Sequence, residues 1–134
     1  MRDVMPLLVV DDVGKTVQYY VHKLGFGVEA QWPGEGAPVA AVVKYKNVKF
    51  MFESKEAYAR HSGHLLTDEP RGVGVELHVL VTDGVGGYHA ELKVMEGVDI
   101  IRHIATNTYG VRQFTIRDLN GYIITFEQYC RDGN

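Results

Sequence analysis

The stretch Val10-Asp11-Asp12, which ends an apolar run and opens a helical pattern, recurs further along the chain as Val81-Thr82-Asp83. The second aspartate follows the first by 83 − 12 = 71 residues, in a chain of 134. Two later segments, Lys49–Ser54 and Ile123–Gln128, also match each other at a similar offset. This internal repeat indicates that one structural module is present twice.

The composition restricts the class of protein. Hydrophobic residues make up 46% of the chain and charged residues 23%, which is typical of a soluble globular protein. No apolar run approaches the roughly 20 residues that span a bilayer, so no membrane segment is expected. The net charge is −3 and the basic residues are scattered, which argues against nucleic-acid binding. The single cysteine, Cys130, fits a reducing compartment, and a cytoplasmic location is expected.

Each copy of the module is predicted to run in the order β-α-β-β-β. In the first copy, residues 1–54, Asp12 caps a helix that Gly25 ends. Its predicted strands are residues 4–10, 27–32, 39–45 and 48–54. Residues 55–71 are predicted to form a short helix and a linker.

The second copy, residues 72–130, is predicted to repeat this order. Asp83 is expected to open its helix, and Asp118–Gly121 to form its last hairpin turn. The predicted strands are residues 73–81, 98–105, 111–117 and 122–129. The sequence therefore predicts one α+β domain, residues 1–134, made of two tandem modules with mixed sheets.

Alternation along the strands separates an apolar face from a mixed one. Glu76 and His78 fall on one face of their strand, and Thr125 and Glu127 on one face of the last strand. Charged groups in mid-strand must be solvated or paired. The pattern favours a wet, concave surface on these faces.

Four segments together resemble the vicinal-oxygen-chelate superfamily, which includes glyoxalase I, bleomycin-resistance proteins and extradiol dioxygenases. They are Pro6–Val13, Tyr19–Phe26, Tyr109–Phe114 and Arg117–Tyr122. The third and fourth are most similar to the bleomycin-resistance branch, although Leu119 stands where that turn commonly has proline. The resemblance covers essentially the whole chain and implies curved mixed sheets around a cavity.

The resemblance also implies where a divalent metal would bind in this chain. Counting from the matched segments gives Met5, Met51, Glu76 and Thr125. Two thioethers, a hydroxyl and one carboxylate are poor ligands for an ion that prefers imidazole and carboxylate groups. No metal ion and no other cofactor is therefore expected.

A displaced metal site is the alternative. Glu76, His78 and His103 would supply three ligands to a metal-dependent lyase, isomerase or dioxygenase if their strands bring them together. The other interpretation is that both histidines are ordinary strand residues with local hydrogen bonds. Glu76 and His78 are also interpreted either as an acid/base pair or as a polar pair lining a pocket.

The resemblance implies a homodimer that sequesters a small organic molecule, as bleomycin-resistance proteins do, and no catalytic residue is expected. Trp32 either offers a surface for stacking a planar ring or caps the core from an edge strand. Arg112 is either a partner for a ligand carboxylate or phosphate or a surface strand arginine. A net charge of −3 is modest for holding a cationic drug, so the ligand is left open. A regulatory or structural binding module is a third interpretation. The candidate ligand-binding residues are Met5, Trp32, Met51, Glu76, His78, Tyr109, Arg112 and Thr125.

Overall fold

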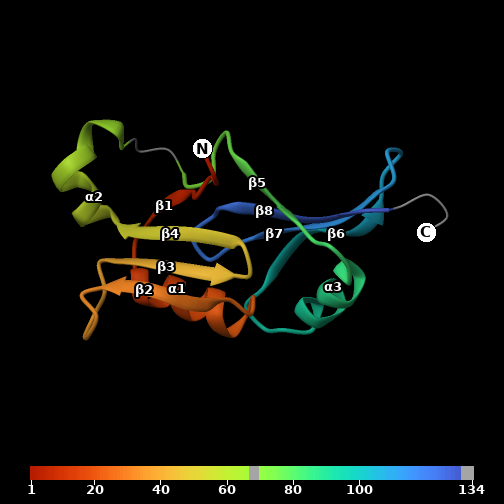
Figure 1. The fold of residues 1–134 in the computed structure, drawn as a ribbon, viewed down its shortest axis with the longest axis horizontal. Helices are drawn as coiled ribbons and strands as arrows, with labels where there is room; N and C mark the ends of the chain where they lie inside the picture. The colour runs from red at the N-terminus through yellow and green to blue at the C-terminus, as the bar shows by residue number, and fades with distance from the viewer. Residues whose placement is uncertain (67–69, 131–134) are drawn as a thin grey trace. The chain divides into compact units, whose positions relative to one another are not determined.

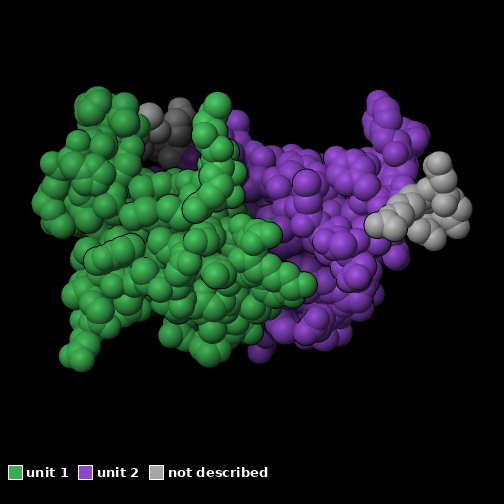
Figure 2. All heavy atoms as spheres, viewed as in Figure 1, with its two compact units in different colours: residues 1–68 green, residues 69–134 purple. Residues whose placement is uncertain are grey.

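The chain forms two compact units in a computed structural model that describes residues 1–66 and 70–130. One unit comprises residues 1–68 and the other residues 69–134, coloured green and purple in Figure 2. Within the described part of the chain, no helix is both long and apolar enough to cross a membrane.

The first unit is a four-stranded mixed sheet with a helix packed on one face (Figure 1). The strand order is β1-β4-β3-β2, in which β1 runs parallel to β4 and the other pairs are antiparallel. A short 3₁₀ turn, Gly63–Leu65, follows the last helix. The elements are β1 (Leu7–Val10), α1 (Val13–His22), β2 (Gly27–Trp32), β3 (Ala40–Tyr45), β4 (Val48–Ser54) and α2 (Lys55–Ser62).

Helix α1 forms where the sequence predicts it. The side chain of Asp12 accepts a hydrogen bond from the backbone N–H of Lys15 at 2.9 Å and so caps the first turn. Tyr20 is fully buried, and its ring centroid lies 4.8 Å from that of Phe52 on β4. Gly25 follows the helix with a φ of +86°, a conformation that glycine adopts without strain. The repeated motif therefore acts as a helix start in this copy.

The second unit repeats this arrangement with its own mixed sheet. Its strand order is β5-β8-β7-β6, and β5 runs parallel to β8. Each unit thus has a β-α-β-β-β order, which confirms the predicted α+β class with two mixed sheets. The elements are β5 (Glu76–Leu80), α3 (Val85–Lys93), β6 (Asp99–Thr106), β7 (Val111–Arg117) and β8 (Ile123–Tyr129).

The start of helix α3 differs from the prediction. Its cap is Gly84, with a φ of +78°, and not Asp83. The side-chain oxygen of Gln128 on β8 accepts the N–H of Val85 at 3.0 Å. A residue distant in sequence therefore supplies an acceptor for the first turn, and the helix begins at Val85, two residues after the Asp83 that was expected to open it.

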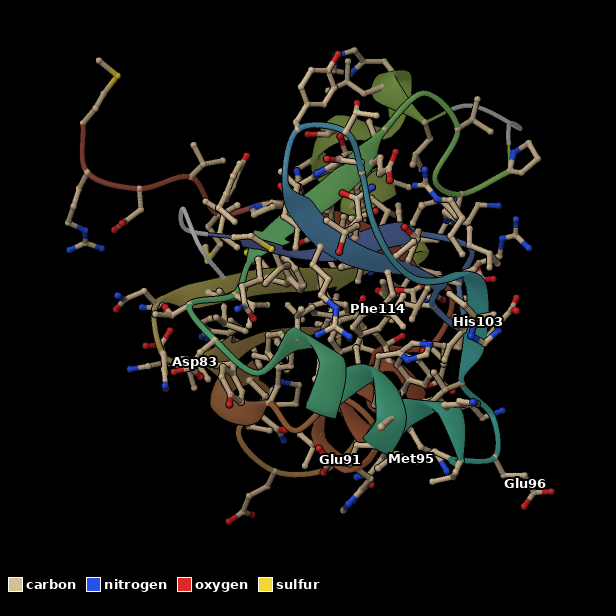
Figure 3. The ribbon with its side chains drawn as sticks, turned by 90° about the vertical axis from the view of Figure 1, so that its right-hand side faces the viewer. Asp83, Glu91, Met95, Glu96, His103 and Phe114 are labelled. Carbon is tan, nitrogen blue, oxygen red and sulfur yellow. The ribbon has the colours of Figure 1, made fainter. Side chains whose placement is uncertain are left out.

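Aromatic rings fill the space between α3 and the second sheet. Phe114 on β7 and Phe126 on β8 stack with their centroids 5.2 Å apart, and Tyr88 from α3 meets Phe126 edge-on at 5.0 Å. Phe114 is fully buried. Figure 3 views the sheet across α3 and labels Phe114 behind the helix. This packing leaves the opposite face of the sheet for polar side chains.

Candidate functional site

The face of the second sheet opposite α3 carries a cluster of polar side chains, called the polar face from here on. Its members come from all four strands because the register aligns them: His78 pairs with Thr125, and Thr115 also pairs with Thr125 from the other side. Arg102 is opposite Thr115 in the β6–β7 pair. The polar face consists of Glu76, His78, Arg102, Thr115, Thr125 and Glu127.

Glu76 is the centre of the hydrogen-bond network on the polar face. Its Oε1 accepts a hydrogen bond from Thr125 Oγ1 at 2.5 Å and a second from the guanidinium of Arg102. Thr125 is fully buried, and its hydroxyl lies 2.7 Å from that of Thr115. A hydroxyl has one hydrogen to donate, so Thr115 is the donor in the bond between the two threonines.

The pKa of Glu76 lies below its ordinary value of 4.5, chiefly because the Thr125 hydroxyl donates to the carboxylate. The charges of Arg102 and His78 lower this pKa further, whereas burial acts in the opposite direction. Glu76 is consequently ionised at neutral pH. Since the folded-state pKa is depressed, the stability it contributes is present above pH 4.5 and is lost as the pH falls through the folded-state pKa.

His78 connects this network to a second carboxylate. Its Nδ1 lies 3.0 Å from Oε1 of Glu127, and its Nε2 lies 3.6 Å from Oε1 of Glu76. The side chain of Glu127 is only 10% exposed, so the imidazole is the partner that compensates this buried carboxylate. His78 therefore lies between two carboxylates: it is within hydrogen-bonding distance of Glu127, and it forms an ion pair with Glu76 when the imidazole is protonated.

His103 does not join Glu76 and His78. Its Nδ1 lies 3.0 Å from Nε2 of His89 on α3, which is the other face of the sheet (Figure 3). The β6–β7 pairing is irregular on both sides of Arg102, and it is this residue that shares a face with Thr115. Across residues 1–66 and 70–130, no three His, Cys, Asp or Glu side chains are grouped so that they could hold a metal ion.

The corresponding face of the first sheet carries apolar residues at the positions equivalent to His78 and Thr125. Leu7 pairs with Met51 in the parallel β1–β4 pair, as His78 pairs with Thr125 in the second unit. Met51 is half-buried, and Met5 is 45% exposed just before β1. Glu53 is the counterpart of Glu127 in the repeat, but it contacts His61 of α2, at 2.8 Å.

Of the three other predicted site residues, Trp32 belongs to the first unit, and Tyr109 and Arg112 belong to the second unit without being members of the polar face. Trp32 ends β2 and is 49% exposed, and Tyr109 in the β6–β7 turn is 88% exposed. The guanidinium of Arg112 lies against Gly86 of α3, and a Cβ on that glycine would be 2.8 Å from Nη1. Arg112 therefore belongs to the helix-covered side of the sheet, opposite Glu76.

Sequence reasoning missed Arg102. No motif marks it, and simple alternation does not place it because the strand is irregular on both sides. The usable signal was chemical: a carboxylate predicted in mid-strand needs a positive or hydrogen-donating partner.

Burial of His89 predicts how stability depends on pH. Its pKa lies below the ordinary 6.5, first because burial disfavours the charged imidazolium. Electrostatic repulsion from the basic groups of His103, Lys93 and Arg112 lowers this pKa further. The unfolded state therefore binds this proton more readily than the folded state. We expect the free energy of unfolding to fall as the pH drops from above 6.5 to below it.

His89→Gln should flatten this part of the profile, which urea titrations at pH 5.5, 6.5 and 7.5 will measure. His22→Gln, on α1 in the other unit, is the matched control and should keep the wild-type slope. An unchanged slope in His89→Gln would show that other groups cause the dependence.

Comparison with known proteins places this geometry in a wider group. The family model described as Glyoxalase/Bleomycin resistance protein/Dioxygenase superfamily matches residues 4–126. A glyoxalase/bleomycin resistance protein/dioxygenase from Nocardioides has a similar structure, with a TM-score of 0.77 at 17% identity, over 100% of this chain and 87% of the other. TioX from Micromonospora sp. ML1 gives 0.74 at 21% identity, over 97% and 100%.

A third similar structure is a bleomycin-binding protein from bleomycin-producing Streptomyces verticillus, solved in complex with copper(II)-bleomycin. Its TM-score is 0.63 at 18% identity, and the match covers 94% of each chain. A comparison with curated proteins finds no match to this sequence. At these identities, the similar structures establish a shared fold.

Proposed function

The chain belongs to the glyoxalase/bleomycin resistance protein/dioxygenase superfamily, and on that premise we propose that it binds a small organic molecule on the polar face without the superfamily's metal ion. Glu76 and His78 are the proposed ligand contacts in the second unit, and the fully buried Thr125 supports them through its hydrogen bond to Glu76. Met5 and Met51 are the proposed apolar contacts in the first unit, and Trp32, Tyr109 and Arg112 stay predictions from sequence.

The observation that carries the metal-free proposal is that the carboxylate of Glu76 is already paired with protein groups. Of the four positions that the resemblance implies, Glu76 alone carries an acidic or imidazole side chain. Its Oε1 accepts hydrogen bonds from both Thr125 and Arg102. A divalent cation at this carboxylate would meet the positive guanidinium directly, and like charges at contact distance repel. These residues therefore do not fit the metal that the superfamily implies.

The chemical mixture on the polar face supports an organic ligand. Leu80 and Tyr129, which share this face by alternation with His78 and Glu127, are each 63% exposed. Exposed apolar surface beside a few fixed polar groups is the usual lining of a small-molecule site. The bleomycin-binding protein of similar fold is a precedent for such binding within this architecture.

We also propose a homodimer that sequesters its ligand, with antibiotic resistance as its role, and both rest on the resemblance. The proposed cytoplasmic location rests on the single cysteine, Cys130. Light scattering after size-exclusion chromatography should give the mass of two chains. The mass of one chain would contradict the dimer and leave the ligand proposal in place.

Metal analysis tests the proposal first. After exposure to zinc, manganese, nickel and ferrous iron, the untagged protein should keep less than about 0.1 equivalent of any metal, because its ligand set cannot compensate an ion for its lost hydration. Mass spectrometry of the washed protein measures this. About one equivalent that is lost in His78→Ala would contradict the proposal and indicate a metal-dependent enzyme.

A further inference from the structure

We propose that Arg102 anchors an anionic group, a carboxylate or phosphate, on the ligand that binds the polar face. This inference rests on the proposed function, since it names the chemistry of the ligand at the same face. It is carried by the position of the arginine, by its unused donors and by the way its neighbours are paired.

Arg102 reaches across the sheet to its partner. It lies on β6 and Glu76 lies on β5, and these are the two edge strands in the order β5-β8-β7-β6. Side chains on a strand ordinarily stand nearly perpendicular to the sheet, so this one leans inward over β7 and β8. The pairing of β6 with β7 shifts on both sides of Arg102, between Ile100 and Arg102 and again between Arg102 and Ala105. Irregularities of this kind redirect a side chain.

The contacts of Arg102 use one end of its guanidinium. Its Nη2 donates to Oε1 of Glu76 and lies 3.4 Å from Oγ1 of Thr125. Among residues 1–66 and 70–130, neither Nε nor Nη1 of Arg102 has a hydrogen-bond partner. The side chain is 54% exposed, so a ligand can reach these donors. A planar guanidinium with free donors fits the two oxygens of a carboxylate or phosphate.

The pairing of the carboxylates favours an anion over a cation. Glu76 accepts from Arg102 and Thr125, and Glu127 is compensated by His78. An organic cation placed at Glu76 would meet the guanidinium of Arg102. An anion placed at Arg102 would meet donors that lack protein partners in the described chain. Glu76 and Thr125 then act as positioning residues that hold the guanidinium in place.

The test is a nitrogen-15 NMR titration of the arginine Nε–H signals with benzoate, phenyl phosphate and benzamide as probes. The signal that disappears in Arg102→Lys is that of Arg102. The variant keeps the positive charge but lacks the planar guanidinium that can donate two parallel hydrogen bonds. We expect benzoate and phenyl phosphate to shift this signal saturably and benzamide to leave it unchanged. Arg102→Lys should weaken binding of both anions by about tenfold or more, because a point charge cannot replace bidentate hydrogen bonds.

Arg60→Lys is the matched control. Arg60 lies on α2 of the first unit and is exposed, so this variant makes the same chemical change at a residue that is not a member of the polar face. This variant should bind both anions as the wild type does. The backbone amide signals of the same samples report whether each variant is folded.

Two outcomes would overturn the inference in distinguishable ways. If benzamide binds as tightly as benzoate and Arg102→Lys changes neither affinity, the polar face binds organic molecules without using Arg102, and the proposed function stands. If none of the three probes shifts any signal from the polar face, the anion anchor and the binding function proposed for this face both fail.

Discussion

Phe114→Ala is expected to lower the free energy of unfolding by about 3–5 kcal/mol, the usual cost of truncating a buried phenylalanine. The ring is fully buried, stacks on Phe126 at 5.2 Å, and meets His89 of α3 edge-on at the same distance. Its removal leaves a cavity between helix and sheet that close-packed neighbours cannot fill. Urea unfolding followed by circular dichroism will measure the loss.

Tyr129→Ala is the control for this substitution, because it removes an aromatic ring of similar size from adjacent β8. That ring is 63% exposed, and its loss should cost no more than about 0.5–1 kcal/mol. Phe114→Leu should fall between the two, since it keeps part of the buried volume. Equal losses in Phe114→Ala and Tyr129→Ala would contradict the assigned core.

Gly72→Ala should destabilise the second unit by at least about 2 kcal/mol, from backbone strain and a steric clash together. Gly72 has a φ of +86°, in the left-handed region that disfavours residues with a Cβ. A Cβ there would also lie 2.4 Å from the carbonyl oxygen of Gly121, in the turn before β8. The clashing oxygen belongs to the backbone of Gly121, so it cannot move aside as the end of a flexible side chain would.

Gly74→Ala separates the two contributions. Gly74 has a similar φ of +78°, but a Cβ there would meet no atom within 4 Å. It should therefore suffer the strain alone, about 1–2 kcal/mol. A loss in Gly72→Ala no greater than in Gly74→Ala would show that the close approach of the two backbone segments costs nothing.

Much of the fold could be predicted because it depends on local patterns. The repeat, the strands Gly27–Trp32, Val48–Ser54 and Val111–Arg117, and the cap at Asp12 all follow from alternation, turn residues and capping chemistry. The first strand of the second unit was predicted too long. It begins at Glu76, because Gly72 and Gly74 have positive φ values that interrupt an extended chain.

The errors concern features that distant residues decide. Gln128 on β8 supplies the acceptor for α3, and no local pattern around Asp83 indicates this. Alternation along the strands correctly placed Glu76, His78 and Thr125 on one face of the sheet. It cannot assign the face of Arg102, because the strand pairing is irregular on both sides of that residue. The same irregularity leaves His103 on the helix side. The ligand-binding roles of these residues are predictions that the titrations above will test.

The matching registers of the two sheets have a consequence for how such a protein can change. The pairs Leu7–Met51 and His78–Thr125 occupy the same backbone positions, yet one pair is apolar and the other polar. The two units therefore have equivalent backbone frames that carry different side chains at the same positions. Substitutions at a few equivalent strand positions can therefore change which ligand a unit binds, while the hydrogen-bonded strand pairing that stabilises the sheet is kept.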